Sequence, residues 1–264
     1  MFSELTMVRL FALLSLAYAV PNALGQAIDN VLVEIYHVEA QLEGPPLATY
    51  RIFIDLAEGY ELQMVYGDER NQLELSTTTT FFNDTSNGAA FGDRIDADRL
   101  DLYPLALDSW LTIGAASDGH WAIPRSSDPD VSILSCSSYG DRSATGIRSG
   151  RVPAPLCTND GLVARDKVAG VVEFRMPTGY VKNIRGSVIH TMDGAWAVLG
   201  GTPGITPDNV VLVAQLSTTG SLKYQLNVQV RTPEKRVLRC VSTEAGPTDE
   251  VRVEALRGTA QWQP

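Results

Sequence analysis

The segment Val210–Arg231 reads VVLVAQLSTTGSLKYQLNVQVR and has the pattern of two β-strands separated by Thr219-Gly220. The first stretch, Val210–Leu216, is apolar at nearly every position, which predicts an interior strand covered on both faces. The second stretch alternates apolar and polar side chains, the period of a strand with one buried face and one wet face. Its apolar members are Leu222, Tyr224, Leu226, Val228 and Val230, and its polar members are Lys223, Gln225, Asn227, Gln229 and Arg231.

A two-residue turn at Thr219-Gly220 would join these stretches into an antiparallel hairpin. Leu226 then lies opposite Val213 and Val228 opposite Val211, so the two buried faces coincide. We expect this hairpin within a sheet. The polar row of the second stretch is then a candidate contact face, the alternative being a face that is merely hydrated.

Several other segments carry strand and turn signals, at intervals of 8 to 15 residues along the chain. They are Val31–Glu39, a second predicted hairpin at Thr49–Gly67 that turns at Ala57-Glu58-Gly59, Leu73–Phe82, Trp196–Gly204, Arg236–Val241 and Glu250–Leu256. An amphipathic helical pattern of any length is absent from the sequence. The predicted fold is therefore all-β, an antiparallel β-sandwich with long loops.

Residues 1–25 have the pattern of a secretory signal peptide, with Arg9, the apolar run Leu10–Val20, Pro21 and a small-residue pattern that ends at Gly25. The alternative is an amphipathic first helix of the mature fold. The apolar run is about half of the roughly 20 residues that a membrane-spanning helix needs. We therefore expect no transmembrane segment, cleavage after Gly25, and a protein that is secreted or held at the cell surface.

The remaining residues, 26–264, are enough for one large β-domain. The stretch 126–160 is rich in Ser, Gly, Asp and Pro. We interpret it as a loop-rich insertion in a single extracellular β-sandwich-like domain. The alternative is a linker between two domains.

The formal net charge is −10, and so acidic a chain repels phosphate backbones. Nucleic acid is therefore excluded as an expected partner, whereas divalent cations remain possible ligands. Four carboxylates lie close together in the sequence, at Asp93, Asp96, Asp98 and Asp101. Calcium prefers oxygen ligands of this kind, but the spacing lacks the glycine and the distal glutamate of an EF-hand loop. The four residues are weak candidates for a calcium site, and the alternative is a solvated acidic loop.

Three cysteines are present, and none has the spacing of a zinc site. Cys136 and Cys157 bracket a turn-rich segment, so in an exported protein we expect a disulfide between them. Pairing of Cys157 with Cys240, or no disulfide, is the alternative.

No catalytic signature occurs in the sequence, which lacks GxSxG, HExxH, a P-loop and a strand-to-helix GxGxxG. His37, His120 and His190 are the only histidines, and each stands alone. No catalytic or cofactor-binding residue is therefore predicted. The aromatic residues that could stack on sugars are Trp110, Trp121, Trp196, Tyr60 and Tyr66, with burial in the core as the alternative.

Several of these stretches together resemble an all-β module of secreted and cell-surface proteins of the phylum Bacteroidota. The resemblance is carried by TYRIFIDLAEGYELQMVYG (49–67), TTTTFFND (77–84), ALDSWLTIGAAS (106–117), WAVLGG (196–201) and VLVAQLSTTGSLKYQLNVQV (211–230). It implies an exported protein, often with a type IX secretion sorting domain, and it assigns no reaction.

The sequence thus favours a non-catalytic secreted or cell-surface domain that acts in surface interaction, as in adhesion or the recognition of a glycan or a surface protein. A structural component of an extracellular assembly is the alternative, and a secreted hydrolase ranks third.

Overall fold

The computed structural model describes residues 26–129, 132–135, 150–152, 154–176, 184–246 and 250–263. The predicted signal peptide and part of the predicted insertion lie outside these ranges. Within them the chain is mostly β-strand, and the strands form several packed sheets in which nearly all pairs are antiparallel. The predicted all-β, sandwich-like fold is confirmed.

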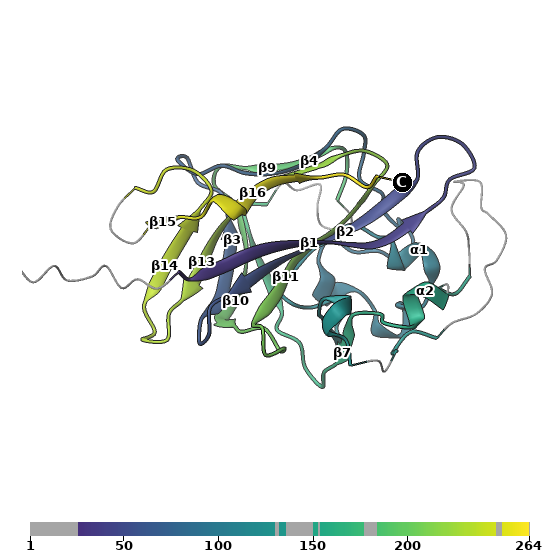
Figure 1. Cartoon of the computed structure of the whole chain (residues 1–264), viewed down its shortest axis with the longest axis horizontal. Coiled ribbons are helices and arrows are strands. Elements are labelled where there is room, and N and C mark those ends of the chain that lie inside the picture. The colour runs from purple at the N-terminus through teal and green to yellow at the C-terminus, as the bar shows by residue number, and fades with distance from the viewer. Residues whose placement is uncertain are drawn as a thin grey trace, which may run out of the picture.

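A central sheet runs through the middle of the molecule (Figure 1). Its strands, in spatial order, are β1 (Ile28–Glu39), β2 (Leu47–Leu56), β11 (Val210–Thr218) and β5 (Trp110–Leu111). Every residue of β11 is buried, and β2 is buried at every position but one. The prediction of an interior strand in Val210–Leu216 is confirmed.

Two further sheets cover one face of the central sheet, at the left and across the top of Figure 1. One consists, in spatial order, of β15 (Glu250–Arg252), β14 (Val237–Val241), β13 (Asn227–Arg231), β3 (Glu61–Tyr66), β10 (Ala195–Thr202) and β8 (Val171–Phe174). The other consists of β16 (Arg257–Ala260), β12 (Leu222–Gln225), β4 (Leu73–Thr77) and β9 (Val188–Thr191). Ile52 and Ile54 of β2 share one buried cluster with Val228 of β13 and Leu75 of β4, so the three sheets enclose a common core.

Short helices, turns and a small strand pair cover the opposite face. These elements are α1 (Tyr103–Ala106), α2 (Ala154–Cys157), β6 (His120–Ala122), β7 (Leu162–Ala164) and the 3₁₀ turns Gly92–Arg94, Ala97–Arg99 and Arg125–Ser127; a further 3₁₀ turn, Glu254–Leu256, precedes β16. Phe53 of β2 and Leu212 of β11 pack here against Tyr103 and Leu162. Since successive strand residues point to opposite faces, Ile52 and Phe53 lie in different cores, which explains why β2 and β11 are apolar throughout.

The predicted hairpin at Thr219-Gly220 is wrong. β11 has β2 and β5 as its neighbours, whereas β12 pairs with β4 and β16, so the chain changes sheets at this turn. Val211 lies opposite Ile54, and Val228 lies opposite Val65 and Cys240. Both edges of β11 are already occupied in the central sheet, which leaves no edge for the following segment.

The segment Leu222–Arg231 is also two strands rather than one. β12 and β13 meet at Leu226 and belong to different sheets, and the Leu226 amide donates to the carbonyl of Leu256. The predicted alternation of burial holds except at Asn227, which is fully buried. The polar row is therefore not one continuous contact face.

The second predicted hairpin differs from the prediction in the same way. The turn at Ala57-Glu58-Gly59 is present, but β2 pairs with β1 and β11 while β3 pairs with β10 and β13. The other predicted strands overlap β1, β4, β10, β14 and β15 but differ in their bounds, and Leu256 lies in a 3₁₀ turn instead of a strand. β16 was not predicted.

The described parts of residues 126–160 pack against the central sheet. Leu134, Val152 and Leu156 share a buried cluster with Phe53 of β2. Cys136 lies outside the described residues, so its disulfide with Cys157 stays a prediction. Cys240 is a free, buried thiol on β14, so its pairing with Cys157 is wrong.

Candidate functional site

Most of the aromatic residues proposed to stack on sugars belong to the core. Trp110, Trp121 and Trp196 are 2%, 4% and 0% exposed, and the Trp196 indole donates to the carbonyl of Thr112 at 2.8 Å. Tyr66 is buried too, and Tyr60 packs, partly buried, against the main cluster. Burial, the alternative raised for these residues, accounts for the three tryptophans and Tyr66.

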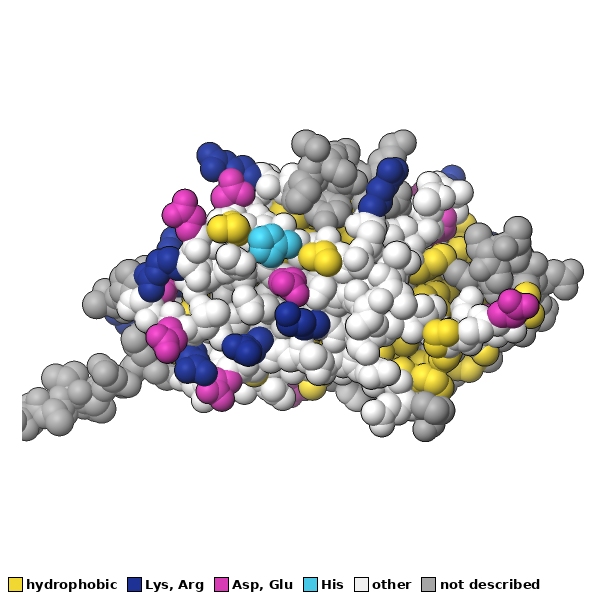
Figure 2. Space-filling model, turned by 90° about the horizontal axis from the view of Figure 1, so that it is seen from above, with side chains coloured by type: hydrophobic (Ala, Val, Ile, Leu, Met, Phe, Trp, Pro, Cys, Tyr) yellow, Lys and Arg dark blue, Asp and Glu magenta, His cyan; other side chains and the backbone are white. Residues whose placement is uncertain are grey.

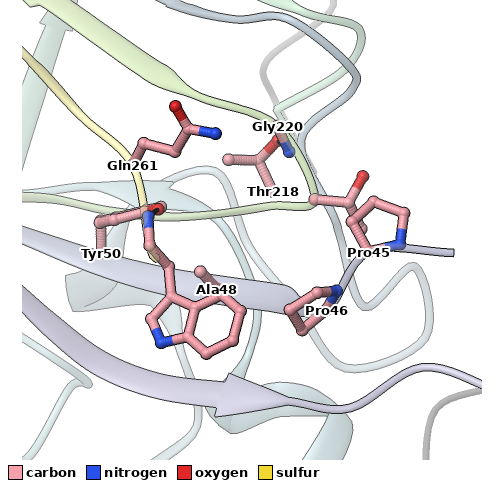
Figure 3. A pocket seen from close by; sticks show the side chains of 9 residues that line it. Pro45, Pro46, Ala48, Tyr50, Thr218, Gly220 and Gln261 are labelled. Carbon is pink, nitrogen blue, oxygen red and sulfur yellow. Dashed lines mark hydrogen bonds between the residues drawn. The ribbon is translucent and has the colours of Figure 1, made fainter. Parts of the chain in front are cut away.

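The fourth tryptophan, Trp262, is partly exposed and lines a pocket of about 260 Å³ (Figure 3). We call this the Trp262 pocket, and its lining residues are Pro45, Pro46, Ala48, Tyr50, Thr218, Thr219, Gly220, Gln261 and Trp262. No periodic pattern marks Trp262, because it follows a short strand and stands among polar residues.

Three segments that are far apart in sequence build the Trp262 pocket. The Pro45-Pro46 loop leads into β2, whose buried Ala48 and Tyr50 form the floor. Ala48 lies opposite Thr218 at the end of β11. The chain after β16 crosses this region, and the Trp262 amide donates to the Tyr50 hydroxyl at 2.7 Å. This bond connects the C-terminal segment to the central sheet.

Threonine hydroxyls hold the β11–β12 turn at the rim of the Trp262 pocket. The Thr218 hydroxyl lies 2.6 Å from the Thr77 hydroxyl and 2.8 Å from the Thr79 hydroxyl, and it accepts from the Gly220 amide at 3.0 Å. The Ser221 amide donates to the Thr78 hydroxyl. A Cβ on Gly220 would lie 2.4 Å from that oxygen, so this close approach requires glycine.

Other polar groups of the pocket keep unused hydrogen-bonding capacity within the described part of the chain. The side-chain amide of Gln261, which is exposed, makes no hydrogen bond there. The Tyr50 hydroxyl accepts from Trp262 and retains its own proton, and Thr219 donates to Thr79 and retains its lone pairs. All nine lining residues are described, and none is charged. The pocket is thus suited to an uncharged ligand that can both donate and accept.

Three of the four candidate calcium ligands are engaged separately, and the fourth, Asp98, is exposed. Asp93 accepts from the Val171 amide at 2.9 Å, and burial raises the pKa of its carboxyl. Asp96 caps the turn at Ala97–Arg99 by accepting from the Asp98 amide, and Asp101 forms an ion pair with Arg151. Among the described residues no group of three or more His, Cys, Asp or Glu side chains could hold a metal ion. Calcium binding stays an untested, weak hypothesis.

The three histidines lie on different strands and have different partners. His37 Nε2 lies 2.8 Å from the Tyr103 hydroxyl, which donates to Glu39 at 2.5 Å. His190, on β9, contacts Gln72.

His120 Nδ1 lies 2.8 Å from the Ser117 hydroxyl, which is a serine–histidine contact of the kind that nucleophilic catalysis requires. Ser117 is fully buried, however, and belongs to the same tight turn as His120. A substrate carbonyl cannot reach the hydroxyl in this arrangement, so the pair is suited to holding the turn.

The chain matches no family model, no curated protein and no solved structure. Within the described ranges, helices are too short or too polar to cross a bilayer. The resemblance to the Bacteroidota module stays a prediction.

Proposed function

We propose that this chain is a non-catalytic binding domain of an exported protein and that it acts by surface contact through the Trp262 pocket. The observation that carries the proposal is the contrast among the four tryptophans. Trp110, Trp121 and Trp196 are buried in the cores, whereas Trp262 is partly exposed and lines a preformed pocket. Concave, mostly apolar sites with a few convergent polar groups are where proteins bind small ligands.

The rest of the architecture supports this assignment. Both faces of β2 and β11 are used for packing, so the loops and strand ends remain for function, as is usual on such scaffolds. In Figure 2, which shows the molecule from above, hydrophobic side chains gather at the right-hand end. Figure 1 places the C-terminal end and the loop between β1 and β2 at that same end. Export rests on the pattern of residues 1–25.

The outer face of β12, which carries part of the polar row, is a weaker candidate for the binding surface than the Trp262 pocket. Lys223 forms an ion pair with Glu74 at 3.1 Å, and Gln225 donates to the carbonyl of Gln72 at 2.9 Å. Both side chains are thus already engaged within their own sheet. Basic and acidic groups intermingle on this face (Figure 2).

A fragment screen by ligand-observed NMR tests the proposal on the purified chain. We expect several small uncharged fragments to bind, and we expect Trp262→Ala to abolish their signals. The matched control is Leu199→Ala, which removes an exposed apolar side chain on β10 that does not line the pocket. No bound fragment, or binding that is insensitive to Trp262→Ala, would contradict the proposal. Turnover of a polysaccharide or peptide library would contradict its non-catalytic part.

A further inference from the structure

Resting on the proposed function, we infer that the ligand of the Trp262 pocket is a neutral sugar, with one ring face against Trp262 and its hydroxyl groups at the polar rim. Four properties of the pocket lead to this class of ligand. They are its size, its apolar floor, its unused hydrogen-bonding groups and its lack of charge.

The volume of the pocket limits the ligand to about one ring. Pockets for drug-sized ligands have volumes of about 300–1,000 Å³, and this one, at about 260 Å³, lies just below that range. A single pyranose unit at the end of a glycan is of this scale.

The floor and walls of the pocket are apolar. Ala48 and Tyr50 are buried, and Figure 3 shows Ala48 between Tyr50 and Pro46. Pro45 and Trp262 complete the apolar part of the lining. A pyranose ring presents C–H bonds on one face and hydroxyl groups around its edge. Aromatic side chains with one apolar side and one wet side complement such amphipathic groups.

The unused polar groups supply both donors and acceptors. Gln261 offers two N–H donors and a carbonyl acceptor, Tyr50 offers its hydroxyl proton, and Thr219 offers lone pairs. Thr218 is excluded from this set, because Thr77, Thr79 and Gly220 already occupy its hydroxyl. Each hydroxyl of a sugar can donate and accept, so it can use either kind of group.

Charge favours neutral sugars over acidic ones. None of the lining side chains is charged, so a carboxylate or sulfate would enter the pocket without a counter-ion. The net charge of −10 adds a repulsive field for anions. A proline-rich peptide is also uncharged and stacks on tryptophan, but proline lacks an N–H donor and so makes no use of the acceptors at Thr219 and Gln261.

Isothermal titration calorimetry on the purified chain tests the inference. The probes are methyl glycosides of glucose, galactose, mannose and N-acetylglucosamine and their short oligomers, together with glucuronic acid and a proline-rich peptide. We expect at least one neutral probe to bind and glucuronic acid to bind at least tenfold more weakly. Trp262→Ala should weaken the best neutral probe at least tenfold, Trp262→Phe should do so less, and Gln261→Ala should weaken it severalfold.

The variants are chosen so that loss of binding does not report unfolding. The Trp262 contact with Tyr50 uses the backbone amide and survives in Trp262→Ala. The indole also packs, partly buried, against the main cluster, so we expect a lower Tm with an unchanged far-UV circular dichroism spectrum, which verifies the fold. Leu199→Ala should bind like the wild type. Stronger binding of the peptide or of glucuronic acid, or no binding of any neutral probe at millimolar concentration, would overturn the inference. If fragments still bind the pocket in that last case, the proposed function stands without the sugar; if nothing binds, both fail.

Discussion

Asn227 shows how a single polar residue can fix a connection through which the chain passes from one sheet to another. Its side-chain amide donates to the carbonyls of Tyr66, Asn71 and Gln72, and its Oδ1 accepts from the Ser242 amide and hydroxyl. The side chain is fully buried, and all of these bonds except the partly buried one to Gln72 are made away from water. Asn227 thereby fixes the start of β13 to the connection between β3 and β4 and to the end of β14.

We predict that Asn227→Ala destabilises the protein strongly, because it leaves buried carbonyls and an amide without partners. Each unsatisfied buried group costs about 1–3 kcal/mol, so the free energy of unfolding should fall by at least about 2 kcal/mol. Urea denaturation measures it. Gln225→Ala, two residues earlier and with one bond at the surface, is the control and should cost about 1 kcal/mol or less. Equal effects of the two changes would contradict the role given to Asn227.

His37 makes the stability of the fold depend on pH. Burial lowers the pKa of His37 below its ordinary value of about 6.5, although the nearby Glu39 opposes this shift. The unfolded chain therefore takes up a proton at a higher pH than the native protein does. The stabilising contribution is complete above about pH 6.5 and is lost as the pH falls through that value towards the native pKa.

We predict that the urea midpoint declines between pH 7.5 and pH 5.5 and that His37→Gln reduces this decline. The glutamine amide can still donate to Tyr103. His120 contributes in the same direction, since burial also lowers its pKa, so the reduction should be partial. His190→Gln, at an exposed position on β9, is the control and should leave the decline unchanged. A decline of full size in His37→Gln would exclude His37 as its source.

At the scale of elements, the turns that carry the chain from one sheet to another are the features that local sequence patterns miss. Apolar patterns correctly identified β1, β2, β3 and β11 as strands, and an unbroken apolar run marked β11 as an interior strand. Alternation showed which side chains of β12 and β13 are buried, except at Asn227. Pairing depends on whether the neighbouring edges are free, and β11 was already enclosed by β2 and β5. The residues of Val210–Arg231 do not indicate which strands pair with this segment, because these partners are distant in the sequence.

The candidate site was predictable only in part, for the same reason. The sequence indicated surface binding through aromatic residues, but it pointed to Trp110, Trp121, Trp196 and Tyr66, which are buried, and to Tyr60, which is partly buried against the main cluster. Trp262 becomes distinctive only where β16 brings it to the start of β2. β16 itself, RGTA, has no apolar alternation to identify it.

The β11–β12 turn depends on the shared hydroxyl of Thr218. We predict that Thr218→Val, which keeps the shape and removes the oxygen, lowers the free energy of unfolding by about 1–3 kcal/mol, because the partly buried contacts with the Gly220 amide and with two threonine hydroxyls are lost. Thermal unfolding followed by circular dichroism measures the change. Thr259→Val, on the exposed side of β16, is the control and should be nearly neutral. An unchanged Tm for Thr218→Val would show that the turn is held by its backbone alone.

At the scale of the whole molecule, the oxidation states of the three cysteines depend on both export and burial. We predict a disulfide between Cys136 and Cys157 and a thiol at Cys240 that stays reduced, since burial raises its pKa to about 12 and keeps it from oxidants. Iodoacetamide at pH 8 should leave the native, unreduced protein unlabelled and should label Cys240 alone after denaturation. Peptide mapping identifies the site, and labelling of all three cysteines without a reductant would contradict the bridge.

The unequal placement of the four tryptophans also has an optical consequence. Trp110, Trp121 and Trp196 are shielded from collisions with solutes, whereas Trp262 lies at the mouth of a pocket. Iodide should therefore quench only a minor, red-shifted fraction of the emission, and that fraction should vanish in Trp262→Phe. A ligand that fills the pocket should protect the same fraction from iodide. Quenching that is spread over all of the emission would show that the cores are open to solvent. If only the Trp262 fraction is quenched, this tryptophan is an intrinsic fluorescent probe of the proposed binding pocket.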